Sequence, residues 1–486
     1  MTEGSSPPRS TGPLLTALCV AGMLAATMQT AVIPILGRIG EQTGAGDTAV
    51  SWIVTANLLS SAVSTPLFGR LGDLRGKRNA IQVCLALMLA GSVLAAITTS
   101  LPLLIVARVL QGAVTGVFPL ALSVARDAVA KEKLTGAMAL ISATLSVGGS
   151  LGLVAAGVLA SGNSDYRNVF WLASAVGVLA IAAVAAWVPG GGAEHGRGSV
   201  DWPGAGLLGG ALVLVLLPLS QGDSWGWGSP ATITLFVLSP FAFLVWVLVE
   251  RRAAAPLVDV GMLTHRTFAL TNVGAVLMGF AMFGLYLGTS MFVQMPTGRA
   301  GYGFSASVLS AATVYLLPPA LISLVAAPMG GILVKRFSGR TGLAVAGSAA
   351  LVGFGSLTLW HGSTAAVITG VVIAGGALSL AYAAMPALVV QSVPLSRTGI
   401  ANSINSIGRS VGASAAGAVV AAVLAATTKD STGLPGESGF VWVFGLSAGA
   451  GALTALGALL ISRTPPRPGP AAPSGTTPRV EERRPV

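Results

Sequence analysis

Apolar residues occur along this chain in runs of about 20, the number that a helix needs to cross the hydrocarbon core of a bilayer. Short polar segments separate the runs. The runs are too long for membrane β-strands and lack the alternation of polar and apolar positions that a β-barrel requires. The pattern predicts an all-α integral membrane protein with about fourteen spans, expected at 14–35, 49–69, 80–98, 102–124, 135–160, 168–188, 203–220, 230–249, 268–294, 304–334, 341–360, 364–386, 398–426 and 440–462.

The composition agrees with a membrane protein rather than with several soluble domains. Of the 486 residues, 53% are hydrophobic and 9% are charged, and the mean hydropathy is +0.81. Soluble domains carry roughly 25% charged residues, so this chain lacks the charge to coat a water-facing surface. Cys19 and Cys84 both lie within apolar runs, which excludes a disulfide framework.

The distribution of Lys and Arg predicts the orientation of the chain. An even number of spans places both termini on one side, and 21 of the 27 basic residues fall on that side, against four on the other. The positive-inside rule therefore places both termini in the cytoplasm. This bias accounts for the net charge of +11 without a nucleic-acid partner. The abundance of Ala and Gly favours a bacterial source and hence the plasma membrane.

A repeat at an offset of about 260 residues divides the chain into two halves. SVGGSLGLVAAG at 146–157 matches SIGRSVGASAAG at 406–417, and Pro34 matches Pro296. Duplicated bundles are typical of secondary transporters, whose substrate site lies between the repeats near mid-membrane. The expected organisation is a cytoplasmic tail (1–13), a six-helix bundle (14–190), an inserted helix pair (199–250), a second six-helix bundle (256–462) and a disordered cytoplasmic tail (463–486).

The repeated segments carry small residues at helical spacing, which let another helix approach closely. We expect these small residues to be helix-packing positions, and the alternative is a role in closing a cavity. The positions are Gly148, Gly152, Gly157, Gly408 and Gly412. Both segments also contain G-x-S-x-G, a hydrolase pattern, but within helices rather than at a strand–turn–helix junction. The sequence offers no paired catalytic groups and no cluster of metal ligands, so we expect no enzyme activity, no cofactor and no metal.

A glycine-rich loop follows the second predicted span. Its sequence is Gly69-Arg-Leu-Gly-Asp73-Leu-Arg-Gly76-Lys77-Arg78. It lacks the Ser or Thr after Lys77 and the preceding strand that a phosphate-binding loop requires, which disfavours transport driven by ATP. Glycines permit a tight turn, and the charged residues can pair with the ends of other helices.

This loop resembles the signature loop of the major facilitator superfamily, G-x-L-x-D-x-x-G-R/K-R/K. Arg108-Val-Leu-Gln111-Gly112 is similar to the R-x-x-Q-G motif of the same superfamily. The resemblance implies alternating access by rocking of one bundle against the other, with the 69–78 loop as the conformational switch. It also implies that Asp73 meets the start of the thirteenth span near Arg397–Gly399.

Three further stretches resemble the fourteen-helix drug:proton antiporter branch of that superfamily, and the resemblance covers residues 14 to about 462. They are Trp52-Ile-Val-Thr-Ala, Tyr166-Arg-Asn-Val-Phe170, and Asp201 to Gly206 followed by Gly226-Trp227.

Two segments depart from the pattern of that branch. In that branch the fifth span usually carries a proline where this chain has Leu153 and a glycine where it has Ala156. The first span usually carries an aspartate where this chain has Ala25. All sixteen acidic residues fall in loops, tails or helix ends. Coupling to protons is therefore expected from the resemblance alone, with loop-edge acids such as Asp127, Asp165 or Asp223 as substitutes for the missing carboxylate where water reaches them.

Polar residues inside the predicted spans indicate the substrate site, because polar groups are costly in hydrocarbon and usually face a cavity. Expected substrate-binding residues are Asn57, Arg108, Gln111, Tyr286, Gln294, Asn402, Asn405 and Arg409, with Met278, Met282 and Met385 at the rim. In the alternative interpretation, Arg108 holds backbone carbonyls, and the Asn side chains form interhelical hydrogen bonds.

These patterns favour a secondary active transporter that exports amphipathic organic compounds such as antibiotics. A cavity with Arg409 and no carboxylate favours neutral or weakly anionic substrates. Two alternatives are an exporter or facilitator of one natural metabolite and a membrane sensor or scaffold without flux. The expected partners are the small-molecule substrate, protons and the lipid bilayer, and we expect a monomer.

Overall fold

The computed structural model of the chain describes residues 11–159, 165–190, 201–253, 258, 260–393, 398–429 and 433–461. The predicted tails therefore lie almost entirely outside the described residues. In the first half, helix α1 (Thr11–Thr30) leads through the 3₁₀ turn η1 (Ile33–Ile35) into α2 (Leu36–Thr43). The helices that follow are α3 (Asp47–Arg75), α4 (Lys77–Ile97), α5 (Leu101–Gly112), which continues through η2 (Ala113–Gly116) into α6 (Val117–Ala128), α7 (Lys131–Leu159) and α8 (Arg167–Trp187).

The inserted pair comprises α9 (Trp202–Trp225) and α10 (Pro230–Glu250). The second half begins with α11 (Val260–Thr264). Its other elements are α12 (Arg266–Phe283), the π-helical η3 (Gly284–Gly288), α13 (Thr289–Gln294), α14 (Thr297–Ala300), α15 (Val308–Ser310), the π-helical η4 (Ala311–Leu316), α16 (Leu317–Arg336), α17 (Gly339–Leu359), α18 (Thr364–Ser392), α19 (Thr398–Ala426), β1 (Thr428–Lys429), β2 (Leu434–Pro435) and α20 (Glu437–Leu459). Strands β1 and β2 pair in an antiparallel ribbon.

In the described part of the chain, thirteen helical runs are long and apolar enough to cross a membrane. The remaining predicted span, 49–69, lies in α3, which has 29 residues. This helix can carry more polar side chains because several of them contact neighbouring helices. Asn57 Nδ2 donates to Arg108 O at 3.1 Å, and the hydroxyls of Thr55 and Ser220 lie 2.6 Å apart. With 29 residues, α3 is long enough to cross a bilayer, although it is not among those thirteen apolar runs.

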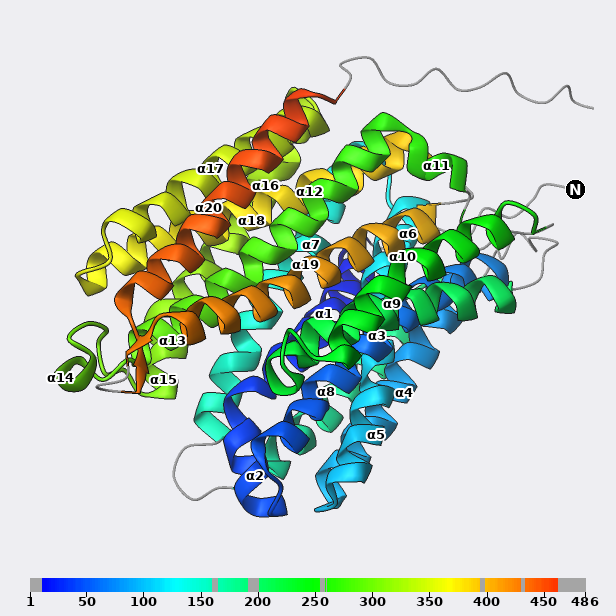
Figure 1. Cartoon of the computed structure of the whole chain (residues 1–486). Coiled ribbons are helices and arrows are strands. Elements are labelled where there is room, and N and C mark those ends of the chain that lie inside the picture. The colour runs from blue at the N-terminus through cyan, green and yellow to red at the C-terminus, as the bar shows by residue number, and fades with distance from the viewer. Residues whose placement is uncertain are drawn as a thin grey trace, which may run out of the picture.

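Each half of the chain has its own apolar core. One cluster of buried residues extends from Leu14 to Val188, and a second extends from Ala275 to Ile461. A third cluster joins Leu212 and Trp246 of the inserted pair to Ile400 and Ile407 of α19. Figure 1 shows the inserted pair lying alongside α3 and α19, so α9 spans the junction between the two halves.

Equivalent helix pairs pack closely in the two halves, as the repeat predicts. In the first half α7 packs on α1, where a Cβ on Gly152 would lie 2.6 Å from Thr27 O and one on Gly148 would overlap Met23 O. In the second half α19 packs on α12, where a Cβ on Gly412 would overlap Val276 O. These contacts are those of helix-packing positions.

The two other glycines of the repeat have looser surroundings. Gly408 faces α12 with 3.4 Å between its Cβ position and Ala275 Cβ. Gly157 faces the other half of the molecule, where the Cα of Leu309 lies 3.4 Å from its Cβ position. Gly157 therefore belongs to the contact between the halves rather than to packing within one of them.

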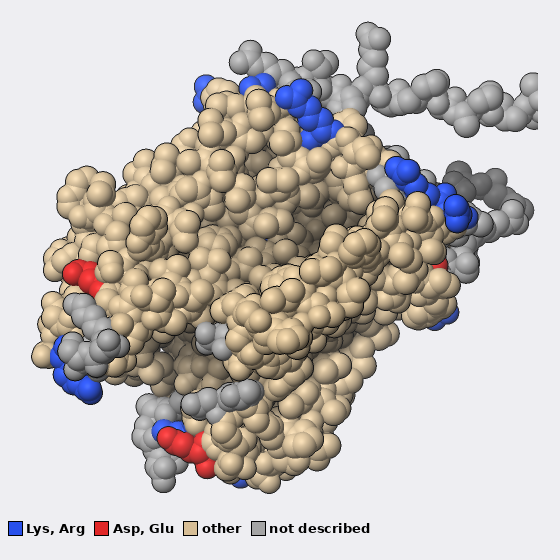
Figure 2. Space-filling view, viewed as in Figure 1, with Lys and Arg blue, Asp and Glu red and all other residues tan. Residues whose placement is uncertain are grey.

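Charged side chains lie at the two ends of the molecule, and the broad middle of the visible face is uncharged (Figure 2). We call one end the basic end; it is formed by the α3–α4 and α16–α17 turns and carries Arg75, Lys77, Arg78, Lys335 and Arg336. The opposite end is formed by α2, α14 and the β1–β2 ribbon. At the basic end the halves meet through α3, α6 and α19 and through α7 and α16.

Candidate functional site

A cavity of about 340 Å³ lies between the two halves. Elements α1, η1, α3, α5, η2, α6 and α7 line it on one side, and α12, η3, α13, α15, α18 and α19 line it on the other. Its polar lining residues are Gln29, Thr30, Asn57, Thr65, Arg108, Thr115, Tyr286, Ser290, Gln294, Tyr382, Ser406, Arg409 and Ser410. None of the described residues that line the cavity is acidic.

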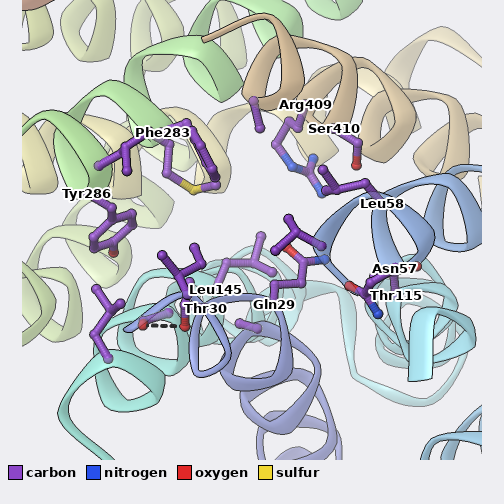
Figure 3. A pocket seen from close by; sticks show the side chains of 18 of the residues that line it. Gln29, Thr30, Asn57, Leu58, Thr115, Leu145, Phe283, Tyr286, Arg409 and Ser410 are labelled. Carbon is purple, nitrogen blue, oxygen red and sulfur yellow. Dashed lines mark hydrogen bonds between the residues drawn. The ribbon is translucent and has the colours of Figure 1, made fainter. Parts of the chain in front are cut away.

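Arg409 is the cation that α19 presents to this cavity. Its Nη1 donates to Asn405 Oδ1 at 2.9 Å and its Nη2 to Ser406 Oγ at 2.8 Å. The guanidinium carbon lies 5.0 Å from the centroid of the Phe118 ring and 5.3 Å from that of Tyr382, which are distances of cation–π contacts. Figure 3 shows the side chain reaching from α19 into the cavity. A guanidinium has five N–H donors, so these two hydrogen bonds leave donors for a ligand.

Arg108 lines the cavity as well, but its hydrogen bonds are those expected in the alternative, structural interpretation. Its side chain is buried, with Nε donating to Ile53 O at 3.2 Å and Nη1 to Met28 O at 3.2 Å. Nη1 also donates to Gln111 Oε1 at 2.7 Å, and Gln111 lies outside the cavity lining. The expectation that Gln111 lines the cavity was wrong, because its Oε1 accepts from Arg108 and its Nε2 donates to Ser92 Oγ at 2.9 Å within the first half.

Asn402 and Asn405 do not line the cavity either. Both are buried; Asn402 Nδ2 donates to Thr398 O at 3.1 Å, and Asn405 lies behind Arg409 and accepts its hydrogen bond. The face of α19 that does line the cavity carries Ser406, Arg409 and Ser410. The short Asn side chains on the neighbouring face cannot reach around the helix.

Three other predicted residues line the cavity. They are Asn57, Tyr286 and Gln294. The Tyr286 hydroxyl lies 3.4 Å from Ser150 Oγ of the other half, and Gln294 Nε2 donates to Ser290 Oγ at 2.9 Å. Of the three methionines expected at the rim, Met282 lines the cavity, whereas Met278 and Met385 are buried in the second core.

Several lining residues were missing from the prediction. Gln29 and Thr30 lie near the end of α1, and Figure 3 shows Gln29 and Arg409 projecting into the same space. Thr30 Oγ1 donates to Gly149 O at 2.7 Å, which links α1 to α7. The same rule that selected Asn57 would have selected Gln29, a polar residue inside a predicted span.

The two positions that depart from the branch pattern also lie at the cavity. Ala25, in place of an aspartate, and Leu153, in place of a proline, both line it. The methyl group of Ala25 thus takes the place of the expected carboxylate, and the side chain of Leu153 takes the place of the expected proline. The described cavity wall contains no carboxyl group that could carry a proton.

The predicted switch loop lies at the basic end, against the start of α19. A Cβ on Gly399 would lie 2.7 Å from Asp73 Oδ1, and Gly69 packs against Ser403. This contact matches the expectation for Asp73, although Arg397 lies outside the described residues. Burial raises the pKa of Asp73 to about 6, against the opposing effect of nearby Lys77 and Arg70.

The other members of the loop attach it to the first half. Gly76 ends α3 with φ = 97°, a conformation that favours glycine. Lys77 forms an ion pair with Asp127, and Arg78 Nη2 donates to Ala185 O at 2.6 Å. Across the junction, the side chains of Arg126 and Thr398 are hydrogen-bonded. The loop therefore belongs to a set of contacts that holds the basic ends of the halves together.

The sequence matches the family model of the Major Facilitator Superfamily over residues 18–417 and again over 278–485. It is 26% identical over 408 residues to "Multidrug resistance protein 3" of Bacillus subtilis, covering 83% of this chain and 77% of that protein. It is 28% identical over 408 residues to the "Tetracenomycin C resistance and export protein" of Streptomyces glaucescens, covering 82% and 73% of the two chains. The structure is similar to that of the human organic anion transporter MFSD10, with a TM-score of 0.64 at 15% identity, over 93% of this chain and 100% of the other.

Proposed function

Because this chain belongs to the major facilitator superfamily and is related to bacterial drug-export proteins, we propose that it exports neutral or weakly anionic amphipathic compounds. It is a multi-pass membrane protein, and its bacterial relatives support a location in the plasma membrane. The observation that carries the substrate class is the cavity, which combines Arg409 with aromatic and aliphatic walls and has no described carboxylate.

The charge of Arg409 favours this class over organic cations. At an effective dielectric constant of about 20, a unit charge about 4 Å away contributes roughly 4 kcal/mol before desolvation. We assign the selectivity to Arg409 rather than to Arg108, because Nε and Nη1 of Arg108 donate to Ile53 O, Met28 O and Gln111 Oε1. Phe118, Tyr382 and Phe283 supply surfaces for aromatic ligands.

Transport by alternating access is part of the proposal. The contacts of Asp73 with Gly399 and of Arg126 with Thr398 close the basic end. The cavity lining extends to Pro34 and Gln294, at helix ends that lie toward the opposite end. If the basic end is cytoplasmic, as the charge bias predicts, this conformation is closed to the cytoplasm and has its cavity toward the outside.

The test is efflux from proteoliposomes of three aromatic compounds of similar size, one anionic, one neutral and one a monovalent cation. We expect the anionic and neutral compounds to be exported. Arg409→Ala should reduce export of the anion by about 10- to 100-fold and of the neutral compound by much less, because hydrogen bonds to charged groups contribute about 1.5–3 kcal/mol. Arg409→Lys should restore the anion only in part, since the fork of donors is lost.

The matched control is Arg340→Ala, which removes one positive charge at the basic end, where Arg340 Nη2 donates to Leu459 O at 2.7 Å. Robust export of the cation that persists unchanged in Arg409→Ala would contradict the proposed substrate class. Proton antiport is tested in the same vesicles with a pH-sensitive dye: substrate addition should move protons, and a flat trace during verified export would exclude it.

A further inference from the structure

A glutamine side chain extends from the first half into the cavity. Gln29 lies in the last turn of α1, lines the cavity and is exposed. The lining residues one turn before it, Ala25 and Ala26, carry only methyl groups. Thr30 is the other polar residue that α1 contributes to the described lining, and its hydroxyl donates to Gly149 O at 2.7 Å. Gln29 is therefore the polar side chain that α1 presents to the open space.

The amide of Gln29 is available to a ligand. No hydrogen bond joins it to another residue of the described chain. The other amides of the lining differ in this respect, because Asn57 Nδ2 donates to Arg108 O at 3.1 Å and Gln294 Nε2 donates to Ser290 Oγ at 2.9 Å. A polar group within a membrane span is costly when nothing pairs with it, and such groups mark substrate pathways. Gln29 thus offers both a donor and an acceptor to a substrate.

The opposite wall presents hydrogen-bond donors from Arg409. This side chain projects from α19 of the second half into the space that Gln29 also enters (Figure 3). Its guanidinium donates to Asn405 and Ser406 and keeps further N–H groups. Because a guanidinium has no acceptor, a ligand group held between the two side chains must accept from Arg409. Toward Gln29 the same group is free either to donate or to accept.

A primary amide can adapt to the protonation state of its ligand. Its nitrogen donates to an ionised oxygen, and after half a turn about the last side-chain bond its oxygen accepts from a hydroxyl. An ionised hydroxyl group therefore accepts from both Gln29 and Arg409. A neutral hydroxyl group accepts from Arg409 and donates to Gln29. Both forms of a weak acid are satisfied at the same place, with no change in the shape of the cavity.

We propose that Gln29 is a specificity-determining residue that, together with Arg409, lets the cavity bind phenolic compounds in both their neutral and their ionised forms. The aromatic rings of Phe118 and Phe283 line the same cavity and suit the ring that carries the hydroxyl. This inference narrows the substrate class and rests on the proposed export function for its role in the cell. Binding itself is measured without transport.

The experiment measures binding of a fluorescent phenol to the full chain in lipid nanodiscs. The probe is umbelliferone, a hydroxycoumarin whose phenol ionises near neutral pH. Its methyl ether is the matched compound without a proton to donate. Titrations below and above the pKa of the probe give the affinities of the two forms. We expect the wild type to bind both forms, and to bind the neutral phenol about twofold to tenfold more tightly than the ether, the range for one hydrogen bond.

Two substitutions separate the donor of Gln29 from its acceptor. Leucine makes no hydrogen bond, so Gln29→Leu should bind the neutral phenol no better than the methyl ether. Glutamate only accepts, so Gln29→Glu should lower the affinity for the ionised form, relative to the neutral form, by about 10-fold or more through repulsion of the phenolate. The matched control is Gln42→Glu, which adds the same charge on α2 outside the cavity lining and should bind both forms as the wild type does.

Three results would overturn the proposal. They are a wild type that does not bind umbelliferone, a Gln29→Leu protein that keeps the full preference for the neutral phenol over its ether, and a Gln29→Glu protein with the wild-type ratio of ionised to neutral affinity. If the new carboxylate pairs with Arg409 and abolishes binding of both forms, the comparison in Gln29→Leu decides.

The outcomes also separate this role of Gln29 from the proposed function. Binding that depends on Gln29 as expected, in a protein whose vesicles export neither umbelliferone nor the three test compounds, would support the site and contradict the export. Export of umbelliferone at the same rate in the wild type, Gln29→Leu and Gln29→Glu would support the export and contradict the role of Gln29.

Discussion

Asp73→Asn tests whether the contact of Asp73 with α19 controls opening of the basic end. Asp73 lies beyond the predicted span 49–69, and burial raises its pKa from 3.8 to about 6. When the contact opens, the carboxyl group returns to water and to its ordinary pKa. The closed contact therefore binds more protons than the open one between pH 3.8 and about 6, so it is stabilised as pH falls through 6 and weakened as pH rises.

The magnitude follows from the shift. Two pKa units correspond to about 3 kcal/mol, which is the cost of holding an ionised Asp73 in the closed contact at neutral pH. Asparagine removes that cost at every pH. We therefore expect Asp73→Asn to favour the state closed at the basic end by up to about 100-fold and to slow transport, because opening at that end becomes limiting.

The assay is the distance distribution between spin labels on the two halves, at Arg75→Cys and Gln391→Cys, with Cys19 and Cys84 replaced by Ser. Below a pH of about 6 the unsubstituted Asp73 protein should shift toward the closed distance, and Asp73→Asn should show that distance at all pH values. Normal transport by a well-folded Asp73→Asn protein, or a distance distribution that still depends on pH between 5 and 7, would refute the reasoning.

Two further predictions concern packing and the buried arginine. Gly412→Leu should destabilise the protein by at least about 1–3 kcal/mol because its Cβ would overlap Val276 O. The control is Gly449→Ala, which should not destabilise the protein because nothing lies within 4 Å of the new Cβ. Thermal unfolding in detergent measures both variants, and equal melting temperatures would contradict the packing. Arg108→Met should lower stability by about 2–5 kcal/mol through lost hydrogen bonds while leaving the charge preference of transport unchanged; a changed preference would show that Arg108 acts on substrates.

Features that depend on local sequence were predictable. The spans follow from runs of apolar residues, since each helix must satisfy its own backbone hydrogen bonds and present apolar side chains to lipid. The repeat identified the helix pairs that pack through Gly152 and Gly412, because close approach of two helices needs small side chains. The charged loop at 69–78 and its contact with Gly399 also agree with the expectation.

Which polar residues face the cavity was decided by the tertiary structure. Arg108 and Arg409 look alike in sequence, as arginines inside apolar helices. Arg108 meets the carbonyls of Ile53 and Met28 because α1 and α3 pack against its helix, whereas Arg409 projects into the gap between the halves. The same distinction separates Asn57, which lines the cavity, from Asn402, which bonds within its own helix.

The sequence alone therefore determined the membrane architecture, the two halves and the family resemblance, all of which rest on patterns within or between short segments. The site required the tertiary structure, since burial of a polar group depends on which helix lies opposite it. Gln29 and Arg409 are the clearest case, because these residues come from different halves of the chain. They line one cavity only when the two halves are packed together.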